Sequence, residues 1–239
     1  MVERYKNKYR IESTRLPGWD YANPGFYFVT ICIKNRECIL GRIENDEMLL
    51  SEAGKMAQSQ WLNTSEIRKN VQLDEFQIMP NHLHGIIIIT HRINDAQNGN
   101  DNNNNNAHNA NNVRDTQGAD GTGDGGVETR CTVSLQSPPQ KPSLPRNVLS
   151  PEQYFRQSFH NRKQNKFGPQ RNNLSSIMGG IKSAATVNIR KMTPDFQWQL
   201  LFNDHVIRNS RELNRIRQYI KNNPANWDTD DKNPKYIKP

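Results

Sequence analysis

Residues 71–90, VQLDEFQIMPNHLHGIIIIT, contain the clearest structural pattern in this chain. It consists of two apolar segments, 71–79 and 83–90, that are each the length of a strand. Pro80-Asn81 between them is a turn signal, because proline and asparagine interrupt strands and favour tight turns. The stretch therefore predicts a β-hairpin.

Two histidines follow the predicted turn. Side chains alternate between the faces of a strand, so His82 and His84 point the same way while Leu83 points into the opposite layer. Ile86 and Ile88 continue the histidine face toward a core. We expect the imidazole pair at the end of the strand, where water and a metal ion reach it. Alone, a His-x-His pattern more often represents two ordinary polar residues at the edge of a sheet.

Four further segments have strand or helix patterns. Residues 26–33 are aromatic and β-branched and predict a central strand. Residues 51–66 have apolar residues at helical spacing after a capping Ser51, and 174–189 show a second helical face. The last strand is expected in either 196–202 or 204–208.

The order of elements, β-α-β followed by β-α-β and a final helix, predicts an α+β protein. It matches the ferredoxin-like split βαβ arrangement, with a four-stranded antiparallel sheet and two helices on one face. The other face of the sheet is expected to stay open for function. The final helix is capped by Asn209 or Ser210 and has Leu213, Ile216 and Ile220 on its buried stripe.

One segment lacks the composition of a folded domain. Residues 95–145 are rich in Asn, Gly and Pro and nearly free of apolar residues, so they cannot bury enough surface to offset the entropy of ordering. We expect a disordered insertion there. Residues 1–94 and 146–239 then form one domain.

Composition restricts the partners and the compartment. The formal net charge is +8, which favours an acidic partner such as nucleic acid over a neutral one. Three cysteines without a paired motif are typical of a reduced cytoplasmic protein. The longest aliphatic stretch, Ile86–Ile89, is far shorter than the ~18–20 residues that span a bilayer. We expect no membrane association.

The final helix carries a second chemical signal. Tyr219 and Asn223 are one helical turn apart, so a hydroxyl and an amide oxygen face one site together. A boundary tyrosine that packs its ring and wets its hydroxyl is the ordinary explanation for Tyr219. For Asn223 the ordinary explanation is the end of a helix before Pro224.

These residues resemble a known family. Pro80-Asn81-His82-Leu83-His84-Gly85 is similar to the histidine-hydrophobe-histidine (HUH) motif of single-tyrosine transposases, and residues 217–224, RQYIKNNP, resemble their Tyr-x-x-x-Asn-Pro helix. The chain is most similar to REP-associated tyrosine transposases. The resemblance covers about 1–94 and 150–228.

The resemblance implies cleavage and rejoining of single-stranded DNA at hairpins or palindromic repeats through a 5′-phosphotyrosine intermediate, without ATP. It assigns the nucleophile to Tyr219 and the ligands of a Mg²⁺ or Mn²⁺ ion to His82, His84 and Asn223. It implies a prokaryotic, nucleoid-associated protein, as a monomer or a homodimer.

Six basic residues are candidates for holding DNA phosphates around the site. Contacts of this kind position a strand without reading its sequence. They are Arg10, Arg15, Lys182, Arg208, Arg211 and Arg215.

Two other functions fit the same pattern. An open ferredoxin-like sheet with aromatic residues also binds RNA in RRM domains without chemistry, although an RRM has aromatic residues in its third strand, where this chain has His82 and aliphatic residues. A relaxase or replication-initiator nickase would keep the HUH site. Such nickases usually belong to longer chains.

Overall fold

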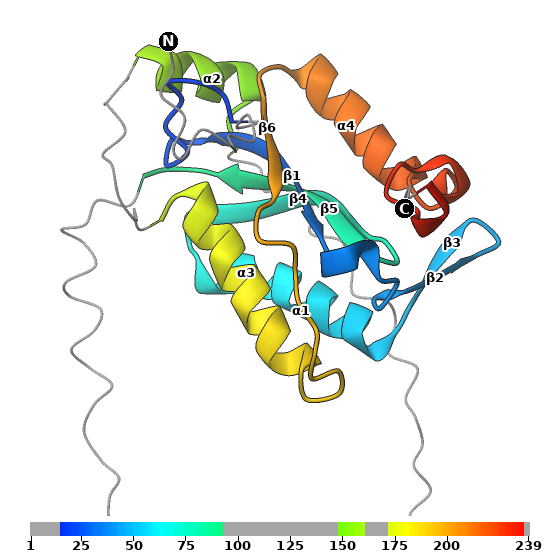
Figure 1. Cartoon of the computed structure of the whole chain (residues 1–239). Coiled ribbons are helices and arrows are strands. Elements are labelled where there is room, and N and C mark those ends of the chain that lie inside the picture. The colour runs from blue at the N-terminus through cyan, green and yellow to red at the C-terminus, as the bar shows by residue number, and fades with distance from the viewer. Residues whose placement is uncertain (1–14, 93–147, 161–171, 237–239) are drawn as a thin grey trace, which may run out of the picture. The chain divides into compact units, whose positions relative to one another are not determined.

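The computed structural model describes residues 15–92, 148–160 and 172–236 (Figure 1). All of them belong to one compact unit, made of residues 1–92 and 141–239. The predicted insertion, residues 95–145, lies outside the described residues, and so does Arg10.

A four-stranded antiparallel sheet is the centre of this unit, as the sequence predicts. Its strand order is β4-β5-β1-β6, which is the order of the split βαβ arrangement. The strands and the two helices that connect them are β1 (Gly25–Cys32), α1 (Glu52–Ile67), β4 (Val71–Ile78), β5 (His82–Ile89), α3 (Leu174–Ile189) and β6 (Asn203–Ile207).

Local signals in the sequence set the limits of these elements. The Ser51 hydroxyl accepts a hydrogen bond from the backbone N–H of Gly54 at 3.1 Å, which caps α1. The hairpin turn between β4 and β5 closes with a hydrogen bond from Met79 N to His82 O. Of the two segments proposed for the last strand, 204–208 is the correct one. In the other segment, Trp198 pairs with Ile33 only as an isolated bridge.

Several elements were not predicted. Strands β2 (Gly41–Glu44) and β3 (Glu47–Leu50) form a separate hairpin, and its turn is made by Asn45 and Asp46, both with positive φ. Helix α2 (Pro151–His160) precedes α3. Short 3₁₀ turns follow α4 (Ser210–Asn222): Trp227–Thr229 and Pro234–Tyr236.

The expectation of an open sheet face is wrong. Helices α1 and α3 pack on one face in a core that includes Tyr27, Val29 and Trp61. The other face packs against α2 and α4, in a second core of Phe26, Ile86, Ile88, Tyr154, Ile207, Leu213, Ile216 and Ile220 (Figure 1). The apolar stripe of α4 has to be covered, and the apolar side chains on this face of the sheet are its partners.

Strand β5 is buried along its whole length. Gly85 is required within it, because a Cβ at this position would lie 2.2 Å from Cζ2 of the buried Trp61 ring on α1. The close approach of α1 fixes β5 from the face opposite the histidines. The strand that carries His82 and His84 is therefore held rigidly.

Candidate metal and nucleophile site

The histidine pair lies at the start of β5, on the face covered by α4. His82 pairs with Cys32 and His84 with Thr30 in the neighbouring strand β1. The expectation that water reaches both imidazoles directly is wrong, since their exposed fractions are 0% and 1%. Tyr219 covers His84, and Trp227 lies against His82 with ring centroids 6.1 Å apart.

Hydrogen bonds fix the tautomer of His82. The Asn81 amide nitrogen donates to the carbonyl oxygens of Arg36 and Lys232, at 3.0 and 2.8 Å. The Asn81 carbonyl oxygen is thereby turned toward Nδ1 of His82, at 2.8 Å. Because this oxygen accepts only, His82 Nδ1 carries the proton, and its Nε2 carries a lone pair.

The outer contacts of His84 are made by hydroxyl groups. Its Nδ1 lies 2.8 Å from the hydroxyl oxygen of Thr30, and its Nε2 lies 3.3 Å from the phenol oxygen of Tyr219. A hydroxyl both donates and accepts, so these two contacts allow the proton of His84 on either ring nitrogen. A hydrogen bond at the outer ring nitrogen, such as that between Thr30 and Nδ1, orients metal-binding imidazoles.

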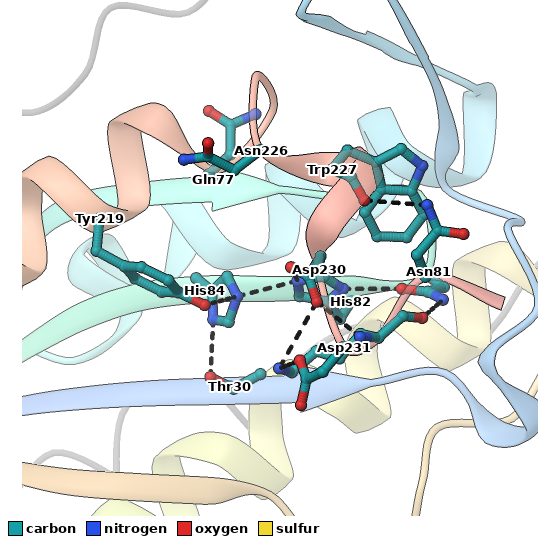
Figure 2. A network of polar contacts seen from close by, with 12 residues as sticks. Thr30, Gln77, Asn81, His82, His84, Tyr219, Asn226, Trp227, Asp230 and Asp231 are labelled. Carbon is teal, nitrogen blue, oxygen red and sulfur yellow. Dashed lines mark hydrogen bonds and ion pairs between the residues drawn. The ribbon is translucent and has the colours of Figure 1, made fainter. Parts of the chain in front are cut away.

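The two inner nitrogens face each other. Nε2 of His82 lies 2.9 Å from Nε2 of His84, within hydrogen-bond distance (Figure 2). Since Nε2 of His82 carries a lone pair, it accepts this bond from the Nε2–H of His84. Burial lowers the pKa of His84 to about 3 and that of His82 well below its usual value, so neither imidazole carries a positive charge at neutral pH. With the His84 proton on Nδ1 instead, both inner nitrogens would present lone pairs, a buried donor set that fits a divalent cation.

Asp230 supplies a third group that the sequence did not reveal. Its Oδ2 lies 3.8 Å from Nε2 of His82, and one ligand atom from each of His82, His84 and Asp230 lies within 4.8 Å of the others (Figure 2). Burial raises the pKa of this carboxyl, as expected for a charged group removed from water. The only signal in the sequence is the acidic run Asp228–Asp231, which follows α4 without any spacing motif.

The segment that carries Asp230 is tied to the histidine turn. Besides the bond from Asn81 to the Lys232 carbonyl, Arg36 Nη1 donates to the carbonyl oxygen of Asp231 at 2.6 Å. Lys232 Nζ lies 2.7 Å from the Asp231 carboxylate and 3.9 Å from that of Asp230. These bonds hold the segment over His82.

Asn223, the predicted third ligand, ends α4 next to Tyr219. The residue is 2% exposed, and its carbonyl oxygen is buried without a hydrogen-bond partner. A buried acceptor that is left unpaired is costly and calls for a ligand. Asn223 thus has an unpaired oxygen available to a ligand.

Tyr219 lies at the edge of the site, and the residue is 45% exposed. Burial raises the pKa of this phenol, although Lys232 and the side chain of Asn223 act to lower it. Edge-on ring contacts with Phe28 and His84 fix the aromatic ring. The phenol is protonated at neutral pH, and part of the side chain is open to solvent.

Two ion pairs hold the tyrosine helix on the sheet. A register shift in β4 between Leu73 and Phe76 contains two consecutive acidic residues, Asp74 and Glu75. Arg217 donates to both carboxylate oxygens of Asp74, at 2.9 and 2.5 Å, and Lys221 lies 3.4 Å from Glu75. The two basic residues stand two positions before and after the tyrosine.

The predicted DNA-binding residues do not form one group. Arg208, Arg211 and Arg215 lie at or near the start of α4 and are exposed. Arg15 contacts Asp204 and Ser175. Lys182 belongs to α3, on the other side of the sheet from α4, and donates to the carbonyl oxygens of residues 199 and 200.

His205 on β6 pairs with Phe28 of β1, whose ring stacks on His84. The side chain of His205 is exposed, on the sheet face that α4 covers, and its Nε2 lies 2.7 Å from Glu212, near the start of α4. It belongs to the hydrogen bonds that begin this helix.

Comparison with known proteins gives one sequence relative and one structural neighbour of interest. No family model matches the chain. An uncharacterized protein of Haemophilus influenzae is 30% identical over 219 residues, which cover 91% of this chain and 90% of the relative. The structure of a REP-associated tyrosine transposase bound to a REP hairpin has a TM-score of 0.44 and 14% identity, and the match covers 87% of this chain and 71% of that one. None of the helices in the described part of the chain has the length and apolar character to cross a membrane.

Proposed function

We propose that this chain, which belongs to the same family as the Haemophilus influenzae protein, is a metal-dependent enzyme that cuts and rejoins single-stranded DNA through Tyr219. One observation carries the proposal: the phenol oxygen of Tyr219 lies 3.3 Å from an imidazole nitrogen that also faces His82 and Asp230. A nucleophile and a set of metal ligands converge at one point, as the motifs shared with HUH single-tyrosine transposases imply.

The ion would be held by Nε2 of His82 and Nε2 of His84, with a third oxygen ligand from Asp230 or Asn223. Imidazole and oxygen ligands together suit Mg²⁺ or Mn²⁺ better than a closed zinc site, which takes softer ligands. When bound, such an ion polarises a phosphate and offsets the charge that develops on it. The two inner imidazole nitrogens, 2.9 Å apart, and the unpaired oxygen of Asn223 support this fit.

The chain's own residues have distinct tasks in this reaction. The Tyr219 oxygen forms a bond to phosphorus, and the bond from phosphorus to the 3′ oxygen of the preceding nucleotide breaks. The phenol proton goes to that leaving oxygen, which becomes a free 3′ hydroxyl, and the downstream fragment stays linked to Tyr219 through its 5′ phosphate. Lys232 and Asn223 favour the ionised phenol, since both lower its pKa. Reversal of the same step rejoins the strand without ATP.

The coverage of the sheet weakens the RRM-like alternative. RRM domains stack bases on aromatic side chains of an open sheet. Here the sheet face that carries Phe26 and Phe28 packs against α2 and α4. A stacking surface of that kind is absent from the described part of the sheet.

A covalent-adduct assay tests the proposal. The protein is incubated with single-stranded hairpin oligonucleotides labelled at the 3′ end, in Mg²⁺, Mn²⁺ or EDTA, and resolved on a denaturing protein gel. We expect a label that migrates with the protein only when metal is present. Tyr219→Phe should abolish it, while Tyr236→Phe, at a tyrosine that is 51% exposed, should retain it.

Two outcomes would oppose the proposal. Tight DNA binding without an adduct on any hairpin would indicate a non-catalytic binding protein. An adduct that survives in Tyr219→Phe would assign the nucleophile to another residue. Addition of a strand with a free 3′ hydroxyl then separates a transferase, which releases the label by rejoining, from a simple nickase.

A further inference from the structure

A cavity lies near the start of α4, at the opposite end of this helix from Tyr219. It has a volume of about 160 Å³ and is lined by the loop 16–23, helix α2 and Arg208. Since α4 rises ~1.5 Å per residue, Ser210 lies on the order of 13 Å from Tyr219 along the helix axis. The cavity is separate from the histidine site, and nothing in the proposed reaction uses it.

Aromatic rings form one side of this cavity. Trp19 stacks on Phe155, with ring centroids 5.2 Å apart and planes at 11°, and Phe159 lies 5.8 Å from Phe155. The Phe159 side chain is 48% exposed, so the aromatic side is reached from solvent. A cavity of about 150 Å³ holds one benzene molecule, which makes this one the right size for a single six-membered ring.

A positive charge lies beside the aromatic side. The guanidinium carbon of Arg208 is 5.6 Å from the centre of the Phe155 ring, and the residue is exposed. An aromatic surface next to an exposed arginine is the combination by which proteins bind single-stranded nucleic acid: bases stack, and the cation holds a phosphate.

The polar groups of the cavity are already used within the protein. Arg92 binds the carboxylate of Asp20 and the side-chain oxygen of Asn23, so the acidic charge is compensated. The Ser158 hydroxyl donates to the carbonyl oxygen of Pro24 at 2.8 Å. A ligand here is therefore recognised by stacking and by charge rather than by hydrogen bonds to its edges.

From these features we infer that the cavity binds one unpaired nucleobase of a DNA strand, with the adjacent phosphate on Arg208. This inference rests on the proposed function in one respect, namely that the ligand is single-stranded DNA. The base is bound on the order of 13 Å away from Tyr219, judged by the length of α4 between them. Because every base has an aromatic face, the site tolerates different sequences.

Fluorescence anisotropy with two probes in EDTA tests this inference without any chemistry. One probe is a labelled oligo-thymidine, and the other is an abasic strand of equal length and charge. We expect the wild-type protein to prefer oligo-thymidine. Phe159→Ala should weaken oligo-thymidine binding about 5- to 100-fold and leave abasic binding unchanged.

Arg208→Ala should weaken the binding of both probes to the same extent. It should also reduce the slope of log affinity against log salt concentration by about the amount expected for one phosphate contact. Met192→Ala, at a methionine with 49% exposure outside the cavity, is the matched control and should bind as the wild type does. Equal loss of both probes in Phe159→Ala, or the same loss in Met192→Ala, would overturn the inference. A Phe159→Ala protein that binds both probes with the affinity of the wild type would also overturn it.

The binding experiment and the covalent-adduct assay can fail independently of each other. If wild-type protein forms no covalent adduct while Phe159→Ala still loses the base-dependent part of binding, the cavity is a base site and the catalytic proposal fails. If Tyr219 forms the adduct while Phe159→Ala binds both probes like the wild type, the catalytic proposal stands and the cavity has no such role.

Discussion

Arg217 donates hydrogen bonds to both carboxylate oxygens of Asp74, and this ion pair joins α4, the helix of Tyr219, to strand β4. The side chains are 23% and 7% exposed, so the pair is largely removed from water. A bidentate pair of this kind has a defined geometry as well as an attractive charge. The position of the tyrosine relative to the histidines therefore depends on an acidic residue in a register shift of β4.

A double-mutant cycle on this pair should give a large coupling energy. We expect Arg217→Ala and Asp74→Ala each to lower the free energy of unfolding, with a coupling of about 1–3 kcal/mol measured by urea denaturation. The exposed pair Arg42–Glu44 is the matched control and should couple by about 0–1 kcal/mol. Equal coupling in the two cycles would show that the Asp74 pair does not fix the helix.

Asp230 should matter for metal affinity more than its exposed neighbour does. Asp230→Asn should weaken Mn²⁺ binding about 10-fold in calorimetry, because a charged oxygen 3.8 Å from His82 becomes neutral. Asp231→Asn, whose side chain is 81% exposed, should bind Mn²⁺ nearly as the wild type does. If Asn223→Ala alone weakens binding and Asp230→Asn does not, the third ligand is the amide predicted from the sequence.

Two glycine substitutions should have opposite effects on stability. Gly85→Ala forces a Cβ against the buried ring of Trp61 and should cost about 1–3 kcal/mol. Gly179 is exposed in the middle of α3, and no atom lies within 4 Å of a Cβ added there. Gly179→Ala should therefore raise the free energy of unfolding by about 0.5–1 kcal/mol through helix propensity. Thermal melting measures both, and a stable Gly85→Ala protein would mean that α1 can move away from β5.

The start of α4 should weaken in acid. The pKa of Glu212 is lowered: burial acts to raise it, but hydrogen bonds from the Arg208 backbone N–H and from His205 outweigh that effect. A lowered pKa in the folded state gives stability that is present above the unfolded value near 4.3 and is lost as pH falls through the folded value.

Glu212→Gln should therefore lower the free energy of unfolding by about 1 kcal/mol at pH 7, a magnitude typical of helix caps. Below about pH 4.3 this difference from the wild type should shrink as the pH falls. Glu66→Gln, at an exposed site on α1, is the control and should change little at either pH. A cost for Glu212→Gln that stays constant from pH 7 to pH 3 would contradict the role of its charge. Urea denaturation at each pH gives the comparison.

The regular elements around the site could be predicted because they depend on local pattern. The structure has the hairpin at 71–90 and the helix capped by Ser51 within a residue or two of the expected bounds. The apolar stripe of α4 consists of the expected residues, Leu213, Ile216 and Ile220. Helix α2 was missed because its sequence, PEQYFRQSFH, is polar and short and follows the Asn-rich segment. The covered sheet face was missed although the stripe of α4 required a partner.

Asp230 could not be predicted for a different reason. It lies in an irregular segment, where no periodicity relates one position to another, and it reaches His82 only because Asn81 and Arg36 bind the backbone of that segment. Contacts between residues 151 and 195 positions apart are set by the whole fold. The orientation of the His84 ring also depends on residues distant in the sequence, Thr30 and Tyr219.

The chain order of these parts has a consequence for biosynthesis. The strand that carries the histidines is made early, whereas Tyr219 and Asp230 are added more than 130 residues later. A ribosome-bound chain that ends before Tyr219 thus holds the imidazoles without the phenol and without the Asp230 carboxylate. Under the proposed function, such an incomplete chain forms no covalent link to DNA.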